Sequence, residues 1–310
     1  MDFVLYLGKK FLLTVILLLG IALITFSLTK ALPGDPALAL VGERASPATI
    51  AAIRKQIGAD KPFLVQYVDY VKMISRGELG RSYFTRREVL DELKQKFPNT
   101  MRLALLAMAL ALPAGLALGF LAAMQRGRPL GEALNSISIV GISVPVFFSG
   151  LLIMLFASLE LKLFPPAGTG GTEFLILPAI TLSLPSIATL SKVSRTSALE
   201  VMGLPFIKTA RAKGISEFRV MAVHIFRNAI IPIVTVAGLD FGSYLNGAVL
   251  TETIFGWDGI GRYSVEGVMR RDYPVVLGTV LAGTVIFIVI NMLVDIAYHV
   301  LDPRVRVYGR

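Results

Sequence analysis

Residues 207–217, IKTARAKGISE, concentrate charge in a chain that otherwise carries little of it. Three basic residues, Lys208, Arg211 and Lys213, fall within about a turn and a half of a helix. Gly214 follows at the position where a left-handed C-cap ends a helix, and basic side chains in a last turn complement the helix macrodipole. The spacing therefore predicts a short basic helix that stops at a glycine turn.

Two functions fit such a helix. Pro205 can occupy its first turn and Ser216 can cap the helix that follows, so the segment would lie across the ends of two apolar runs. It could anchor to anionic lipid headgroups, which is the interpretation that charge alone favours. It could instead dock on a cytoplasmic partner and pass that partner's motion to the spans, because the small Ala210 and Ala212 leave one side slim enough to enter a groove.

A second set of polar residues lies inside an apolar run. Asp240, Ser243 and Asn246 recur at a spacing of three between residues 228 and 251, which predicts that they share one helix face. An ionisable group at membrane depth usually faces a polar partner or a water-filled cavity. We expect this face to line a translocation pathway, and a structural hydrogen-bonding role for Asp240 is an equal alternative.

The sequence lacks the common signatures of catalysis and cofactor binding. It has no G-x-x-x-x-G-K-[ST] phosphate loop, no H-E-x-x-H zinc motif and no G-x-S-x-G nucleophile elbow. It has no cysteine, and its two histidines, His224 and His299, are too far apart to form a metal pair on one helix face. We expect a pore or carrier that is not an enzyme, binds no metal or other cofactor, and has no energy-supplying site of its own.

The composition indicates a membrane protein. Hydrophobic residues make up 55% of the 310 positions and charged residues 17%, against about 25% charged in soluble domains, and the mean hydropathy is +0.70. Because a span needs about 20 apolar residues, we expect six helices at about 9–30, 100–125, 133–160, 174–197, 226–252 and 273–300. The first run is too long for a removable signal peptide, and Pro145 is expected to kink the third span.

The basic residues predict the orientation. Lysine and arginine gather in the short segments that lie inside when both termini are cytoplasmic, which accounts for the net charge of +10 without a nucleic-acid partner. The first span, 1–30, then leads into an extracytoplasmic insert, 31–97, in which 46–58 and 61–76 are expected to be amphipathic helices. A membrane domain at 98–302 and a cytoplasmic tail at 303–310 complete the predicted organisation.

The motifs resemble one transporter family. One segment is similar to the EAA-type loop of ABC-importer permeases, in the form found in the dipeptide/oligopeptide/nickel family. The similarity is greatest to the first permease subunit of such systems. The matching residues are Thr209–Gly214, Ser216-Glu217, His224, Arg227-Asn228-Ala229 and Pro232. Lys208 and Thr209 depart from the acid and alanine of the general pattern, as in the peptide branch. The resemblance continues in order through LPGDP (32–36), IGADKPFLVQY (57–67), GELGRS (77–82), SVPVFFSGLLIMLFA (143–157), ETIFGWDGIGRY (252–263), RDYPVVLG (271–278) and NMLVDIAYHVLDPRVR (291–306).

The resemblance implies an all-α fold of the type I ABC importer, with the permease domain at 98–302 and a cytoplasmic coupling helix at 204–217. It implies a second homologous permease, two ATP-binding subunits that bind ATP and Mg²⁺, an extracytoplasmic substrate-binding protein, and a bacterial or archaeal cytoplasmic membrane whose lipid surrounds the spans. Such a complex would import di- and oligopeptides by alternating access. Nickel complexes or oligosaccharides are open alternatives. A secondary transporter would be expected to show internal repeats, and none is visible.

The resemblance also implies roles for individual residues. Gly214 would supply the turn after the coupling helix, Glu217 would pair with a basic ATPase side chain, and Phe206 would fill an apolar pocket of the ATPase. The full set of implied ATPase-coupling residues is Phe206, Ala210, Arg211, Gly214, Ser216 and Glu217. Independently of the resemblance, Trp257 is expected to be an aromatic anchor at the membrane interface.

Overall fold

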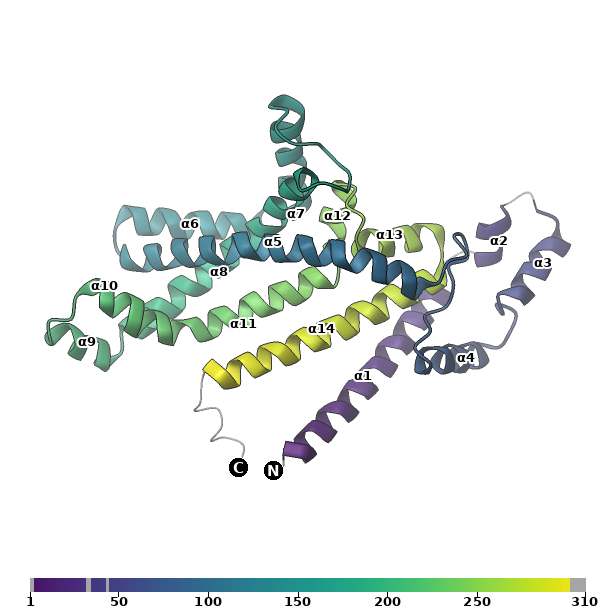
Figure 1. Cartoon of the computed structure of the whole chain (residues 1–310), viewed down its shortest axis with the longest axis horizontal. Coiled ribbons are helices and arrows are strands. Elements are labelled where there is room, and N and C mark those ends of the chain that lie inside the picture. Colours follow the sequence, from purple (N-terminus) through teal and green to yellow (C-terminus); the bar gives the residue numbers. More distant parts are fainter. Residues whose placement is uncertain (1–2, 32–34, 43–44, 302–310) are drawn as a thin grey trace.

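A computed structural model describes residues 3–31, 35–42 and 45–301, so the expected tail at 303–310 lies outside the described residues. Throughout these ranges the regular elements are helices (Figure 1). The α-helices are α1 (Phe3–Ala31), α2 (Pro36–Val41), α3 (Pro47–Gln56), α4 (Phe63–Ser75), α5 (Val89–Met124), α6 (Pro129–Ser143), α7 (Val146–Ile153), α8 (Glu173–Met202), α9 (Pro205–Ala212), α10 (Glu217–Arg219), α11 (Phe226–Leu245), α12 (Val249–Ile254), α13 (Ile260–Arg270) and α14 (Tyr273–Leu301). Two π-helices, η1 (Met154–Glu160) and η2 (Val220–Ile225), continue α7 and precede α11.

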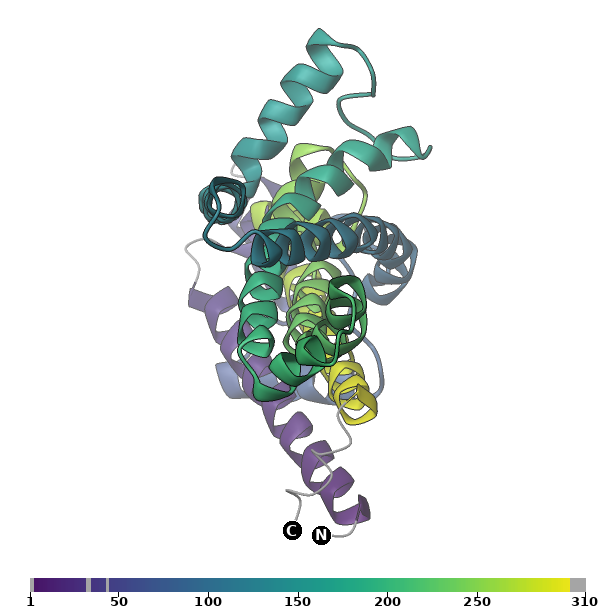
Figure 2. The same cartoon turned by 90° about the vertical axis from the view of Figure 1, so that its left-hand side faces the viewer.

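Five helical segments of the described chain are long and apolar enough to cross a membrane, and a bent pair can supply a sixth span. The five lie at Leu12–Lys30, Val89–Met124, Glu173–Met202, Glu217–Leu245 and Tyr273–Val294. The third expected span is not one tilted helix, because α6 and the α7–η1 segment meet at 99°. Val144 is extended, as the residue before a proline prefers, so the bend falls where Pro145 predicted a kink. Figures 1 and 2 show α7 and η1 projecting away from the bundle.

Other elements also differ from those expected, and the fourth span continues to Met202 instead of ending at 197. The second span begins at Val89 instead of 100, so α5 has 36 residues and a length of about 54 Å, well beyond the hydrocarbon thickness. The fifth span ends at Leu245 instead of 252, and α12 follows as a separate short helix. The insert contains the two expected helices as α3 and α4, and also α2, which the sequence did not predict.

The centre of the bundle is the long contact between α5 and α8. Small residues on the buried face of α5 allow the two backbones to approach, as is usual between membrane helices. They are Ala104, Ala107, Ala111, Gly115, Gly119, Ala122 and Ala123. A Cβ atom at Gly119 would lie 2.4 Å from the carbonyl oxygen of Ser191, so this position accepts no side chain unless the helices separate.

Replacement of Gly119 by valine is expected to destabilise the fold, because the atom that its side chain would clash with belongs to the backbone of α8 and cannot move aside as a side chain could. Overpacking of this kind costs about 1–3 kcal/mol, which corresponds to a fall in Tm of about 1.5–5 °C for a chain of this size. Thermal unfolding of the purified protein in detergent measures the effect. Gly20→Val is the matched control, because a Cβ at Gly20 has no atom within 4 Å. Equal Tm values for the two variants would contradict the packing argument.

Candidate functional site

The predicted basic helix is present as α9, and its buried residues pack it against the helix bundle. Ile207 is fully buried and Ala210 is 7% exposed. Both belong to a hydrophobic cluster at the end of the bundle opposite α2–α4 (Figure 1). The cluster draws its other buried members from α5, α8, η2 and α11: Ala123, Ala198, Val201, Val220, Ile225 and Ala229. A displacement of α9 therefore acts directly on the ends of three long membrane helices.

The glycine turn after α9 is confirmed. Gly214 has φ +74°, in the left-handed region that a residue without a Cβ adopts at little cost. Its N–H donates to the carbonyl of Arg211 at 2.9 Å, and the N–H of Ile215 donates to the carbonyl of Ala210 at 3.3 Å. This pair of bonds is the Schellman motif, and Ile215 also packs against the cluster that holds Ala210. The turn thus sets the direction in which the chain leaves α9.

Two of the predicted residues bridge the turn. Arg211 Nε donates to Glu217 Oε1 at 2.8 Å, and its terminal nitrogen donates to Oε2 at 3.2 Å. The sequence did not predict this internal pair, in which Glu217 already has a basic partner. Both side chains are well exposed, so the pair contributes at most about 1 kcal/mol to stability. Ser216 occupies the N-cap position of α10 with an extended backbone, but its hydroxyl makes no capping hydrogen bond, so that part of the expectation is wrong.

The outer face of this segment combines aromatic and basic side chains. Phe206 is 43% exposed and Phe218 is 84% exposed. Lys208 and Lys213 are exposed beside them, whereas Ala210 is turned toward the bundle and does not lie on this face. Phe218 was missed by the sequence analysis. The sequence feature that could have indicated it is a lone aromatic residue directly after Ser216-Glu217 in an otherwise polar turn.

The three residues expected on one face of the fifth span point to different neighbours. Asp240 accepts a hydrogen bond at 2.6 Å from Ser186 of α8, whose hydroxyl also contacts the hydroxyl of Tyr244. Asn246 lies against α14, because its side chain fills the space that a Cβ at Gly283 would need. Ser243 is exposed between them. The spacing of three advances 300° along a helix, so residues 240 and 246 are about 120° apart around the axis.

A buried carboxylate organises the opposite end of the bundle. Glu252 is fully buried, and it accepts hydrogen bonds from the Thr100 hydroxyl at 2.8 Å and from the Arg262 N–H at 2.9 Å. The glycines of ETIFGWDGIGRY make room for it, since a Cβ at Gly259 would lie 2.4 Å from the carboxyl group. Burial raises the pKa of Glu252, and the hydrogen bonds that it accepts act in the opposite direction. The segment is therefore a tightly wound structural turn.

Trp257 is not an interfacial anchor. Its side chain is 4% exposed, and its Nε1 donates to the carbonyl oxygen of Asn99 at 3.1 Å. The neighbouring Asp258 pairs with Lys96 at 2.5 Å. The indole is buried because the turn around Glu252 folds back onto α5, a long-range contact that local sequence does not specify.

Replacement of Thr100 by valine tests the turn around Glu252. The Thr100 hydroxyl donates to Glu252 and accepts from the N–H of Ile260 at 2.9 Å, so an isosteric valine leaves two buried groups unsatisfied. Loss of about 1–3 kcal/mol in the free energy of unfolding is expected, with a lower Tm. Thr284→Val is the control, because that hydroxyl bonds only a carbonyl of its own helix. A Tm change no larger than the control's would contradict this role.

A second set of hydrogen bonds at this end of the bundle joins the motifs GELGRS (77–82) and RDYPVVLG (271–278), which are far apart in sequence. The Ser82 hydroxyl donates to Asp272 at 2.5 Å, and the N–H of Tyr83 donates to the other carboxylate oxygen at 3.1 Å. Asp272 is almost completely buried. The loop before α5 is thereby fixed to the start of α14. Within the described residues, no group of three or more histidine or acidic side chains gathers as a metal site.

The arrangement defines a class: an all-helical, multi-pass membrane subunit with the fold of type I ABC importer transmembrane subunits. A solved structure of the MetNI methionine ABC transporter in an inward-facing conformation matches it with a TM-score of 0.59 at 16% identity, over 68% of this chain and 96% of that one. An amino acid ABC transporter solved with histidines matches with a TM-score of 0.51 at 16% identity, over 74% and 97% of the two chains.

The chain belongs to the family of binding-protein-dependent transport system inner membrane components, which it matches over residues 115–307. Residues 3–104 match the N-terminal part described for these membrane components. A putative peptide transport system permease protein of Brucella abortus is 40% identical over 297 residues, covering 93% of this chain and 95% of the relative. The dipeptide transport system permease protein DppB of Escherichia coli is 38% identical over 320 residues, covering 93% and 94%. The chain is thus a multi-pass inner-membrane transport permease.

Proposed function

We propose that this chain is a permease subunit of an ATP-driven importer that carries di- and oligopeptides across the cytoplasmic membrane of a bacterium or archaeon. The observation that carries the proposal is α9, a short amphipathic helix that is rooted in the bundle by Ile207 and presents Phe206 and basic residues outward. The peptide substrate class is inferred from the relatives, which are named as peptide or dipeptide permeases and which this chain matches along nearly their whole length.

In this proposal the chain hydrolyses nothing. Two ATP-binding subunits supply the energy and hold ATP and Mg²⁺, one docking on α9–α10 of this chain and the other on a second, homologous permease. An extracytoplasmic binding protein delivers the peptide to the opposite end. Nucleotide-driven movement of the ATP-binding subunits shifts the balance between inward-open and outward-open states, because the two states present the docking helices differently.

The packing of α9 explains how force would pass into the membrane. The buried side of α9 contacts the ends of α5, α8 and α11, while its exposed side is free to bind. The Schellman turn at Gly214 and the Arg211–Glu217 pair keep α9 and α10 in one fixed relation. We propose that the ATP-binding subunit holds Phe206 and Phe218 in apolar pockets, and that Arg211, Ser216 and Glu217 form the polar border of that contact.

The residues of the fifth span are proposed to border the pathway. Ser243 and Asn246 are exposed and Asp240 is partly buried, with Asp240 bonded to α8 and Asn246 lying against α14. A peptide has a charged amine and carboxylate and a polar backbone, all of which need polar groups at membrane depth. Asp240 accepts a hydrogen bond from Ser186, so it would bind the cationic end of a peptide only in a state in which that hydrogen bond is broken.

Uptake into sealed vesicles tests the proposal. The assembled transporter would be reconstituted with its binding protein, and radiolabelled dipeptide would be supplied on the side of α2–α4. Accumulation that requires ATP on the α9 side is the expected result. Accumulation driven by an ion gradient without ATP would overturn the proposal in favour of a secondary transporter.

A further inference from the structure

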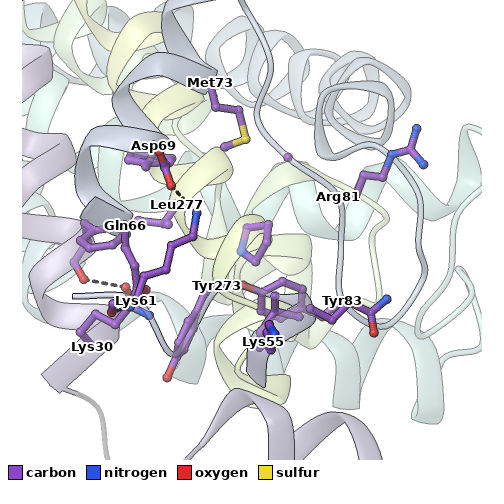
Figure 3. A pocket seen from close by; sticks show the side chains of 18 residues that line it. Lys30, Lys55, Lys61, Gln66, Asp69, Met73, Arg81, Tyr83, Tyr273 and Leu277 are labelled. Carbon is purple, nitrogen blue, oxygen red and sulfur yellow. Dashed lines mark hydrogen bonds and ion pairs between the residues drawn. The ribbon is translucent and has the colours of Figure 1, made fainter. Parts of the chain in front are cut away.

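A basic cavity of about 430 Å³ lies at the end of the bundle that carries the insert (Figure 3). Its walls come from the last turn of α1, from α3 and α4, from the loop before α5, and from the first turns of α14. Its lining includes four cations and one acid: Lys30, Lys55, Lys61, Arg81 and Asp69. The cavity is therefore suited to a ligand of negative charge.

Two of the four cations already have acidic partners. Lys61 forms an ion pair with Asp69 (dashed line in Figure 3), with Nζ 2.7 Å from the carboxylate, and Arg81 Nε lies 2.8 Å from Glu88. Within the described part of the chain, Lys30 and Lys55 form no ion pair. Lys30 is half-buried, and its ammonium group lies 5.7 Å from the ring centre of Phe26 and 5.5 Å from that of Tyr273. The ammonium group has three hydrogen-bond donors, and within the described residues it makes no hydrogen bond to a carboxylate.

The cavity lies at the level where membrane headgroups are expected. Lys30 is the last residue of the apolar run Leu12–Lys30, and Tyr273 is the first residue of the run Tyr273–Val294. Two spans therefore reach their boundary at the same place. Lysine, tyrosine and phenylalanine side chains at a span boundary are typical of the zone between hydrocarbon and water.

Exposed apolar residues lie on α1 and α4 next to the cavity. The preceding turns of α1 expose Leu19 and Leu23, which share a helix face with the cavity residues Phe26 and Lys30. Helix α4 lies beside this half of α1 and not beyond its end, because the Tyr67 hydroxyl donates to the carbonyl oxygen of Leu19 at 3.1 Å. This helix exposes its own apolar residues, among them Leu64 at 71%.

We propose that this cavity binds an anionic phospholipid, with the phosphate beside Lys30 and Lys55 and the acyl chains along the exposed apolar residues of α1 and α4. A soluble anion would use the cations but not the apolar surface below them, whereas a phospholipid uses both. The lipid would join α1, α4 and α14 at one point and hold the insert against the bundle.

Native mass spectrometry of the purified full-length transporter tests the site. The protein would be delipidated in an uncharged detergent and titrated in parallel with phosphatidylglycerol, phosphatidylcholine and inorganic phosphate. Phosphatidylglycerol should be retained in preference to phosphatidylcholine, and inorganic phosphate should not displace it. Lys30→Gln and Lys55→Gln should each weaken phosphatidylglycerol binding about fivefold. Lys72→Gln should leave binding unchanged, because Lys72 is an exposed lysine of α4 that does not line the cavity.

Three results would overturn the proposal. Equal retention of phosphatidylcholine would show that charge does not select the ligand. Displacement of the lipid by millimolar phosphate would identify a site for a soluble oxyanion. Unchanged phosphatidylglycerol binding in Lys55→Gln would show that the cavity is not the lipid site. This variant remains informative even if Lys30→Gln fails to insert, because Lys55 is exposed and its replacement disturbs no packing.

Discussion

Replacement of Gly214 by valine is expected to reduce ATP-driven peptide uptake at least about tenfold while the protein still inserts in the membrane. The residue has φ +74°, where a side chain costs about 1–2 kcal/mol and a β-branched one more. Relief of that strain breaks the bonds from Gly214 and Ile215 to the end of α9, and α10 then leaves in another direction. In the proposed complex the ATP-binding subunit contacts α9 and α10 together, so a change in the direction of α10 would impair the transmission of its movement to the spans. Vesicle uptake at matched protein levels measures the effect.

Gly127→Val provides a closely matched control. Gly127 also has a left-handed backbone, with φ +77°, and a Cβ at either glycine meets no atom within 4 Å. It lies between α5 and α6, outside the α9–α10 segment, so it should retain most of the uptake. Full uptake by the Gly214 variant, or an equal loss in both variants, would contradict the role of the α9–α10 turn.

Replacement of Phe218 by alanine is expected to weaken the binding of the ATP-binding subunits about 30-fold. At 84% exposure the ring contributes little to this chain's own stability, and a large aromatic residue that becomes buried at an interface commonly accounts for 2 kcal/mol or more. The affinity of the purified ATP-binding subunits for the permease in lipid nanodiscs provides the measurement, and the Tm should not change.

Phe156→Ala is the control for this second prediction. Phe156 is 58% exposed on η1, far along the chain from α9, and its replacement removes the same ring from a surface outside the proposed docking segment. Equal affinities for wild type and the Phe218 variant would show that α10 lies outside the contact, which would then be confined to α9.

Features that depend on a few adjacent residues could be predicted from the sequence. Gly214 indicated the end of α9 because a glycine after a basic turn has one common use, and the turn has that geometry. The amphipathic helix expected at 46–58 is likewise present as α3, and the hydroxyl of Ser46 at its start accepts a hydrogen bond from the N–H of Thr49. The family, the all-helical fold and five of the six expected spans followed from motifs and hydropathy, and the sixth is present only if α6 and the α7–η1 segment count as one bent span.

Features that depend on distant contacts could not be predicted in the same way. Pro145 located a bend in the third span, but the 99° angle depends on how α6 and α7 pack on α8. Trp257 was misplaced because its partner, the carbonyl of Asn99, lies on another helix. Ala210 has the size that suits a docking groove, and the same size lets α9 pack closely on its own bundle. Hydropathy cannot distinguish these two uses of a small residue.

The most direct test of the account is gentle purification of the tagged chain from its own membranes, followed by mass spectrometry of what accompanies it. We expect two ATP-binding subunits, or one in two copies, together with a second six-span permease, and we expect Gly214→Val and Phe218→Ala to lose the ATP-binding subunits first. A chain that is recovered alone or only with itself, and that still moves solute without ATP, would contradict the account and leave α9 as a helix that binds lipid headgroups.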